Sequence, residues 1–471
     1  MIYKNINDIQ NINFSVIIVG SGPAGISLAI KLAERKIKSL IVEAGSEDYS
    51  ENSQEFFISK VIGDQINDLQ SSRLRQFGGT SAQWGGWSKP MENYNLSSWG
   101  INFDELSKLS DQACEILDIK NNFRKSNINN YFHQTEFQYS NVKFKEKYKN
   151  YISKSRFVNL LLNTQVTNFG GSNNIVEYAD CMFQKKKIKI YSKIFILSAG
   201  GIENSRILLY TQSQNNLLNN EITIGKYWMT HPWFLGGYGI LKKRELINFL
   251  GSRYIDREGP IHISSTENLK NDKNILSGSI YMDAEENKKL HKEIIKDLLC
   301  ISPDLGKKIA RGIFKKDLKC GNIFLHLEES PNNGNKITLD KNVMDPNGVP
   351  ITNLHYKKSK QTLISAKTIL EEFAEVCRKL DLGRIAINRN IYELEKYESL
   401  GVYHHIGGTR IGDRTDNSVV DMNLKVHKTE NLFVVGSSVF PTSGYTNPTF
   451  TIVQLSLRLG EHLFKKLSDI S

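Results

Sequence analysis

The 471-residue sequence has no apolar run that approaches the ~20 residues of a membrane-spanning helix. Its start lacks a basic segment followed by a long apolar one, and it lacks a twin arginine, so we expect a cytoplasmic protein without a membrane span. Cysteine is scarce and dispersed, with no CxxC pair. This argues against a disulfide framework or a metal site and favours a reducing compartment. The five cysteines are Cys114, Cys181, Cys300, Cys320 and Cys377.

Long blocks of one charge are also absent, although the net charge is +11. The dense basic stretches are short, at 184–190 and 312–320, and the other lysines are scattered among asparagine and isoleucine. This distribution is typical of a solvated surface, so we expect no nucleic-acid partner. Apolar residues make up 39% of the chain and charged residues 24%, as in globular proteins, and the length suggests two or three domains.

The N-terminal part begins with a strand–turn–helix–strand pattern. The β-branched run "FSVIIVG" at 14–20 predicts a buried strand, and "ISLAIKLAERK" shows the apolar spacing of a helix. "KSLIVEAG" at 38–45 predicts a second strand, which completes a βαβ unit.

The turn of this unit carries a GxGxxG sequence, which is suited to binding the pyrophosphate of a dinucleotide at a helix N-terminus. Glu43 ends the second strand, where a carboxylate can accept the ribose hydroxyls of adenosine and would repel the 2′-phosphate of NADP. The motif itself leaves NAD and FAD open. The predicted cofactor-binding residues here are Gly20, Gly22, Pro23, Ala24, Gly25 and Glu43.

The rest of the chain predicts an α/β fold with a second, sheet-rich part. Between 233 and 400, short strand-like runs alternate with Gly, Asn and Pro turns, which favours an antiparallel sheet, with a helical insert at 285–318 and an amphipathic helix at 363–380. We therefore expect a Rossmann-like domain assembled from discontinuous segments and a substrate-binding domain. The predicted ranges are 10–100, 155–232 and 401–471 for the first domain, 101–154 for a helical and loop insertion, and 233–400 for the second domain.

Near the C-terminus, a histidine pair stands beside flexible glycines, and an asparagine stands beside a rigid proline. His404 and His405 precede "GGT", and Asn447 precedes Pro448. A histidine can serve as a general base near neutral pH, and an amide could orient the same hydroxyl group. From these residues alone, an ordinary structural role for the histidines stays open.

Eight segments in chain order resemble the glucose–methanol–choline (GMC) family of FAD-dependent oxidoreductases. They are "VIIVGSGPAG", "IVEAGS", "FGGTSAQWGG", "ILSAGGIENSRILL", "IGKYWMTHP", "PNNGNKITLD", "HHIGGTRIG" and "GSSVFPTSGYTNPTFTI". The "HIGGT" and "NPT" pairing is similar to that of bacterial sugar dehydrogenases and pyranose oxidases. The resemblance implies FAD as cofactor and oxidation of a sugar, a sugar-containing metabolite or another alcohol to a carbonyl by hydride transfer to flavin N5.

By motif position, the resemblance implies that His405 is the base, Asn447 its partner and His404 a neighbour. It implies that His231 is structural, and His326, His355 and His427 are expected to be ordinary residues. Gly436 stands where many family members have an aspartate. The resemblance adds these cofactor-binding residues: Gly78, Gly79, Thr80, Ser81, Gln83, Trp84, Gly85, Gly86, Ala199, Gly200, Gly436, Ser437, Asn447, Pro448 and Thr449.

The loop "FGGTSAQWGGW" at 77–87 is expected to follow the flavin ring, with glycines that allow close approach of the backbone. In covalently flavinylated relatives a histidine stands at the position of Gln83, so the FAD is expected to be non-covalent. Three alternatives remain: a FAD-containing lyase or decarboxylase, the FAD subunit of a multi-subunit dehydrogenase, and a generic nucleotide-binding protein. The substrate, the electron acceptor and the oligomeric state are not predicted.

Overall fold

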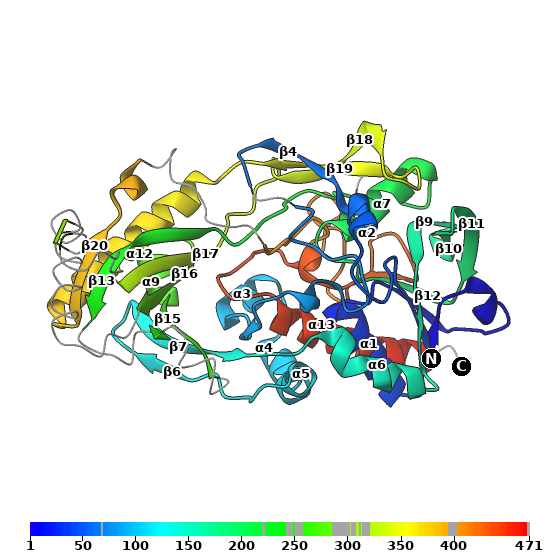
Figure 1. The fold of residues 1–471 in the computed structure, drawn as a ribbon, viewed down its shortest axis with the longest axis horizontal. Coiled ribbons are helices and arrows are strands. Elements are labelled where there is room, and N and C mark those ends of the chain that lie inside the picture. Colours follow the sequence, from blue (N-terminus) through cyan, green and yellow to red (C-terminus); the bar gives the residue numbers. More distant parts are fainter. Residues whose placement is uncertain are drawn as a thin grey trace.

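The structure is a computed structural model. It describes residues 1–66, 69–218, 222–241, 248–249, 258–284, 321–393 and 403–468, together with 302, 308–309 and 312. The helical insert expected at 285–318 therefore falls outside the described residues, apart from these isolated positions. Figure 1 shows an elongated molecule with a helix-covered parallel sheet at one end and an antiparallel sheet at the other.

The predicted βαβ unit is confirmed. Strand β2 (Val16–Val19) is followed by helix α1 (Pro23–Glu34) and strand β3 (Ser39–Val42), and both strands are fully buried. They lie in a six-stranded parallel sheet of order β1-β8-β3-β2-β12-β21. The other strands are β1 (Ile2–Tyr3), β8 (Val158–Leu161), β12 (Ile194–Leu197) and β21 (Leu432–Val434). Segments far apart in the sequence thus build one parallel sheet.

Helices and a small sheet cover the parallel sheet. The closing helix α13 (Thr449–Ser468) packs on α1, where Gly460 lets the helices approach because a Cβ there would lie 2.5 Å from the Lys31 side chain. Helix α7 (Glu203–Gln214) packs on strand β9 of a three-stranded meander, β9–β10–β11. That meander comprises β9 (Thr164–Ser172), β10 (Ile175–Phe183) and β11 (Lys186–Tyr191), and further helices are α5 (Ser110–Leu117) and α6 (Phe144–Lys154).

A nine-stranded sheet forms the other end of the molecule (Figure 1). Its main path is β20-β13-β17-β16-β15-β7-β5, with β14 paired to β16 and β6 to β7. The amphipathic helix expected at 363–380 is confirmed as α12 (Lys360–Lys379), whose apolar face packs on this sheet. The strands are β5 (Trp87–Ser88), β6 (Lys125–Asn127), β7 (Phe132–Tyr139), β13 (Trp233–Leu241), β14 (Asn248–Phe249), β15 (Glu258–Ser265), β16 (Gly278–Ala284), β17 (Gly321–Leu327) and β20 (Gly383–Ile387).

The range 101–154, expected to hold helices and loops, also supplies strands β6 and β7 to this sheet, so that expectation was incomplete. The sequence of β7, "FHQTEFQY", brings side chains alternately toward the interior, which is the two-residue period of a strand rather than a helix. A small sheet of order β18-β19-β4 similarly joins β4 (Ser59–Gly63) to β18 (Lys336–Met344) and β19 (Pro350–Tyr356). The boundaries of the domains stay a prediction.

Short helices connect these layers. They are η1 (Ile6–Ile9), α2 (Glu51–Gln54), η2 (Glu55–Phe57), η3 (Gly79–Ala82), α3 (Asn93–Ser98), α4 (Phe103–Ser107), α9 (Glu267–Lys273), η5 (Arg389–Tyr392) and η7 (Ser437–Val439). Within the part of the chain that the structure describes, no helix is both long and apolar enough to cross a membrane.

Candidate active site

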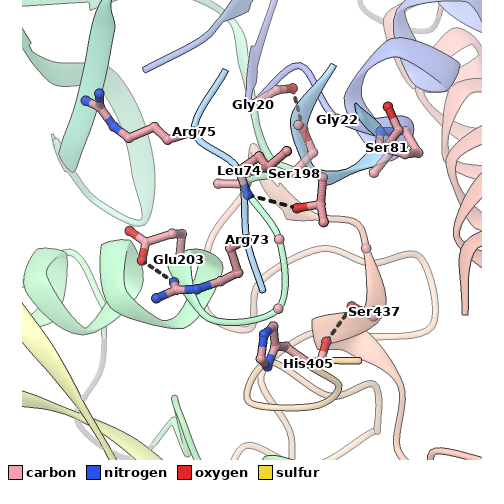
Figure 2. Close-up of a pocket in the computed structure, with 18 of the residues that line it drawn as sticks. Gly20, Gly22, Arg73, Leu74, Arg75, Ser81, Ser198, Glu203, His405 and Ser437 are labelled. Carbon is pink, nitrogen blue, oxygen red and sulfur yellow. Dashed lines mark hydrogen bonds and ion pairs between the residues drawn. The ribbon is translucent and has the colours of Figure 1, made fainter. Parts of the chain in front are cut away.

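A cavity of about 700 Å³ lies at the carboxyl ends of β2, β3 and β12. This is the edge where parallel α/β sheets bind their ligands. The loop 71–87, residues 403–405 and the segment 447–449 before α13 close the cavity on its other sides. Figure 2 shows Gly20 and Gly22 at one side of the cavity and His405 and Ser437 at another.

The N-terminus of α1 is open to this cavity. Gly22 is the N-cap residue and makes no side-chain capping bond, so the N–H groups of the first helical turn lack that partner. Gly20 has φ +101°, and a Cβ there would lie 2.8 Å from the Ser198 carbonyl oxygen. A Cβ at Gly25 would lie 2.1 Å from the Gly20 carbonyl oxygen, so Gly25 permits close packing of the helix on the strand. An uncapped helix N-terminus is suited to a phosphate.

Glu43 is held as a hydrogen-bond acceptor at the end of β3. Its Oε2 accepts from the Ser21 N–H at 2.9 Å and from the Ser21 hydroxyl at 2.6 Å, and its Oε1 accepts from the Gly45 N–H at 2.8 Å. The carboxylate is 6% exposed and lines the cavity. Since each carboxylate oxygen has two lone pairs, Glu43 can still accept from a ligand hydroxyl.

Arginines form a wall that sequence reasoning missed. Arg73 pairs with Glu203 at 2.9 Å, as Figure 2 shows, and Arg206 pairs with Asp345 at 2.8 Å. The Arg75 guanidinium lies 4.0 Å from the centre of the Phe56 ring. Burial lowers the pKa of Arg75 to about 10, so it stays charged at neutral pH. The "RLRQFGG" sequence beside the glycine loop was the available signal for a site that accepts an anion.

His404 is joined to two other side chains in the cavity. Its Nδ1 lies 2.9 Å from Nδ1 of His231, and its Nε2 lies 3.4 Å from Nδ2 of Asn447. His231 in turn contacts the Ser443 carbonyl oxygen through Nε2, at 2.9 Å. Burial lowers the pKa of His231 to about 4, and burial followed by three neighbouring histidines holds the pKa of His404 well below its usual range. Both imidazoles are therefore neutral at pH 7.

His405 has different surroundings. Its Nε2 lies 2.9 Å from the Ser72 hydroxyl, which donates its proton to the Leu69 carbonyl oxygen at 3.0 Å. The ring stacks on Trp228 with centres 5.9 Å apart, and burial, then Arg73, lowers the pKa of His405 to about 3. The structure therefore brings Asn447 to His404, whereas the sequence had predicted a pair of Asn447 and His405.

Aromatic rings of the antiparallel sheet line the cavity near the histidines. The His326 ring centre lies 5.9 Å from that of Trp87 and 5.4 Å from that of Trp233. Burial lowers the pKa of His326 to about 3, and its buried Nε2 has no hydrogen-bond partner among the described residues. His326 was expected to be an ordinary residue, but it lines the cavity.

Two family models match separate parts of the chain, and each match contains residues that line the cavity. The model described as "FAD binding domain" matches residues 15–55, and the one described as "GMC oxidoreductase" matches residues 331–456. These matches support the GMC oxidoreductase family for this chain. The second match contains the His404 and Asn447 segments, and the first contains the GxGxxG turn and Glu43.

Curated relatives align with parts of this chain. A 2-methyl-1,2-propanediol dehydrogenase of Mycolicibacterium austroafricanum is 28% identical over 31% of this chain and 26% of that protein. The fructose dehydrogenase large subunit of Gluconobacter japonicus is 23% identical over 60% of this chain and 49% of that protein. A paromamine 6'-oxidase of Streptomyces fradiae is 33% identical over 28% of this chain and 23% of that protein. The chain thus spans half the length of these relatives or less.

Solved structures share the fold of this chain. A pyridoxine 4-oxidase from Mesorbium loti superposes with a TM-score of 0.62 at 13% identity, covering 96% of this chain and 99% of that chain. A formate oxidase superposes with a TM-score of 0.57 at 14% identity, covering 98% and 99%. These likenesses confirm the expected α/β fold.

The match to an FAD-binding domain supports FAD as the cofactor of this chain. The residues present fit it, because an uncapped helix N-terminus, the Glu43 acceptor and buried arginines line one cavity. All predicted cofactor-binding residues line this cavity except Gly25 and Gly78. Their individual contacts with FAD stay predictions. No cluster of metal-ligating side chains occurs among the described residues.

The glycine loop at 77–87 divides into two kinds of position. A Cβ at Gly78 would lie 2.8 Å from the Lys145 backbone, and one at Gly86 would lie 2.0 Å from the Ser140 carbonyl oxygen, so these glycines serve packing within the protein. A Cβ at Gly85 would meet no atom of the described residues within 4 Å, and Gly85 borders the cavity. The Ser81 hydroxyl donates to the Gly78 carbonyl oxygen at 2.7 Å, so its proton is already engaged.

Proposed function

We propose that this chain is a FAD-dependent oxidoreductase that oxidises a hydroxyl group of a sugar, a sugar-containing metabolite or another alcohol to a carbonyl. The observation that carries this proposal is the neutral imidazole of His404 beside the Asn447 amide, in the same cavity as the FAD-binding residues. The names of the relatives, a propanediol dehydrogenase and a fructose dehydrogenase subunit, support a hydroxyl-bearing substrate.

The reaction divides between the cofactor and the residues of this chain. When bound, FAD supplies the acceptor that takes up the carbinol hydrogen together with its bonding electron pair. His404 Nε2 accepts the hydroxyl proton, and the Asn447 amide N–H donates to the hydroxyl oxygen as negative charge develops there. Burial of the site excludes water, which strengthens both interactions.

Geometry favours His404 over His405 as the base. The Nε2 of His405 is already engaged by the Ser72 hydroxyl at 2.9 Å, and that hydroxyl also lies 3.0 Å from the Leu69 carbonyl oxygen. The other ring nitrogen of His405, Nδ1, is buried without a hydrogen-bond partner among the described residues. His404 instead presents Nε2 beside Asn447. These contacts favour a positioning role for His405, which also lines the cavity.

The aromatic residues of the cavity support a substrate that presents an apolar face and a hydroxyl group. Trp87 and Trp233 offer flat apolar faces, and the Nε2 of His326, which has no hydrogen-bond partner among the described residues, can contact a hydroxyl. We propose that FAD is bound without a covalent link, since the Gln83 amide is a poor nucleophile and its Nε2 donates to the Ser71 carbonyl oxygen at 2.8 Å. Acid precipitation should release the flavin into the supernatant.

Anaerobic titration of the yellow holoprotein with a panel of alcohols and sugars tests this function. We expect at least one compound to bleach the FAD absorbance and to be recovered as its carbonyl product. If no hydroxyl compound reduces the flavin, while the protein cleaves or decarboxylates a substrate, the lyase or decarboxylase alternative is correct.

The multi-subunit alternative has an observation of its own, because one aligned relative is by name the large subunit of a dehydrogenase. In that case substrate still bleaches the FAD of the isolated chain, but oxygen and soluble acceptors reoxidise that FAD slowly. Adding fractions of the source cell that restore turnover would identify the missing component. Rapid turnover of the isolated chain with a small acceptor would exclude this alternative.

A further inference from the structure

We infer that His231 is a positioning residue that fixes the tautomer of His404, through a chain of hydrogen bonds that ends on the Ser443 carbonyl. This inference rests on the proposed function, in which Nε2 of His404 accepts the substrate proton. His231 was expected to be structural, and its ring lies edge-on to that of His404, with centres 5.0 Å apart and planes at 84°.

The first step concerns the proton of His231. The Ser443 carbonyl oxygen can only accept, so the Nε2 of His231 at 2.9 Å must carry a proton. A neutral imidazole has one ring proton, and this one is therefore used. The Nδ1 of His231 is left with a lone pair that points toward His404.

The second step concerns His404. Its Nδ1 lies 2.9 Å from the Nδ1 of His231, and two lone pairs at this distance would repel each other. His404 must therefore donate from Nδ1, which leaves the lone pair of a neutral His404 on Nε2. That nitrogen lies 3.4 Å from the Asn447 amide nitrogen, which can donate to it. Without His231, the Nδ1–H tautomer would lose its partner.

The same chain limits the basicity of His404. The titratable groups that act on it are His231, His326 and His405, and each lowers its pKa further below the value that burial gives. This arrangement differs from a histidine held by a carboxylate, since neutral His231 orients the ring without stabilising the protonated form by a negative charge. His404 is thus pre-set as an acceptor that stays neutral in mildly acidic solution.

A structural role and a positioning role make different demands on residue 231. A structural role requires a side chain that fills the volume, whereas positioning requires an acceptor at the place of Nδ1. His231→Leu fills the volume and removes the acceptor. His231→Asn places an amide oxygen near the position of Nδ1 and can restore it. His355→Leu is the matched control, because His355 lies on β19 and does not line the cavity.

The test is histidine nitrogen NMR of the FAD-loaded protein labelled with ¹⁵N-histidine, with the His404 signals assigned by their loss in His404→Gln. We expect wild-type His404 to be protonated on Nδ1 and unprotonated on Nε2. In His231→Leu we expect a mixed or reversed tautomer and a reduction rate lower by roughly 10–100-fold, the usual effect of losing such an orienting partner. His231→Asn should recover part of both, and His355→Leu should match the wild type.

Two results would overturn the inference: a proton on Nε2 of His404 in the wild type, or an unchanged tautomer in folded, FAD-bound His231→Leu. The NMR result does not depend on turnover. If the His404 tautomer depends on His231 as expected but no hydroxyl compound reduces the flavin, this inference is correct and the proposed function fails. If His404→Gln lacks reduction while the tautomer is independent of His231, the proposed function holds and this inference fails.

Discussion

The Nδ1 atoms of His231 and His404 lie 2.9 Å apart, although the two residues come from different parts of the chain. His231 precedes β13, the strand that carries Trp233 into the antiparallel sheet, and His404 precedes the glycines that lead back to the parallel sheet. This contact joins the side of the cavity lined by the antiparallel sheet to the side lined by the parallel sheet. The other ring nitrogen of His404, Nε2, lies 3.4 Å from the Asn447 amide nitrogen.

Asn447 is expected to act on the rate rather than on FAD binding. Replacing it with alanine removes the donor beside Nε2 of His404 and beside the developing alkoxide. The loss of a hydrogen bond to a charged group, about 1.5–3 kcal/mol, corresponds to a reduction rate lower by roughly 10–150-fold. Stopped-flow bleaching of the bound FAD measures this effect. An Asn447→Ala protein that reduces FAD at the wild-type rate would remove Asn447 from the mechanism.

Glu43 is expected to determine how tightly FAD binds. Glu43→Gln replaces one acceptor oxygen by an NH₂ group, which must face either the Gly45 N–H or the two Ser21 donors. We expect the Kd for FAD to rise at least about tenfold, since the variant also offers one acceptor oxygen fewer to the ribose hydroxyls, and one unmatched buried hydrogen bond to the ligand costs roughly 1–3 kcal/mol. Titration of the apoprotein by flavin fluorescence gives the Kd. Glu430→Gln, at an exposed position, is the control and should leave the Kd unchanged.

Acid should destabilise the protein through its buried histidines. Burial lowers the pKa of His231 to about 4 and those of His326 and His405 to about 3, from an unfolded value near 6.5. Between these values the unfolded chain binds more protons than the folded one. This stability is therefore fully present above pH 6.5 and is lost as the pH falls toward 4.

Calorimetric melting of the apoprotein between pH 7.5 and 4.5 measures this loss. We expect Tm to fall steadily below pH 6.5, and His326→Phe to show a shallower fall because one titrating group is missing. A Tm that stays constant down to pH 4.5 would show that these histidines are not held neutral.

The two glycines at positions 85 and 86 should respond differently to alanine. Gly86 has φ +73°, and its Cβ would lie 2.0 Å from the Ser140 carbonyl oxygen, so Gly86→Ala should lower stability by about 2 kcal/mol or more. A Cβ at Gly85 would meet open space among the described residues, so Gly85→Ala should leave the Tm of the apoprotein near the wild-type value. If the flavin ring packs there, Gly85→Ala should weaken FAD binding. Equal Tm values for the two variants would contradict this division.

Much of the fold followed from local sequence patterns. The β2–α1–β3 unit and helix α12 have a clear apolar period, and they were predicted close to their observed bounds. Strand β7 was missed because its many polar residues conceal an alternating pattern that only pairing with β15 explains. A short segment of sequence does not indicate which distant strand it will pair with.

The site was predicted only in part for a related reason. Motif position identified the loop that carries both histidines, but adjacent residues of an extended chain point to opposite sides. Which side faces the cavity depends on distant residues: Ser72 and Trp228 engage His405, and His231 engages His404. The buried arginines were also not predicted. Arg73 and Arg75 are held at the cavity by contacts with Glu203 and Phe56, which lie elsewhere in the sequence.

Flavin reduction by the same hydroxyl substrate in His404→Gln and His405→Gln, followed anaerobically by stopped flow, tests the central claim most directly. Both variants should bind FAD, as their visible spectra will show. We expect His404→Gln to reduce its FAD roughly 10²–10⁴-fold more slowly than the wild type, the usual contribution of a positioned base, and His405→Gln to show a much smaller loss. Near-wild-type reduction in His404→Gln together with near-complete loss in His405→Gln would contradict the account and make His405 the base.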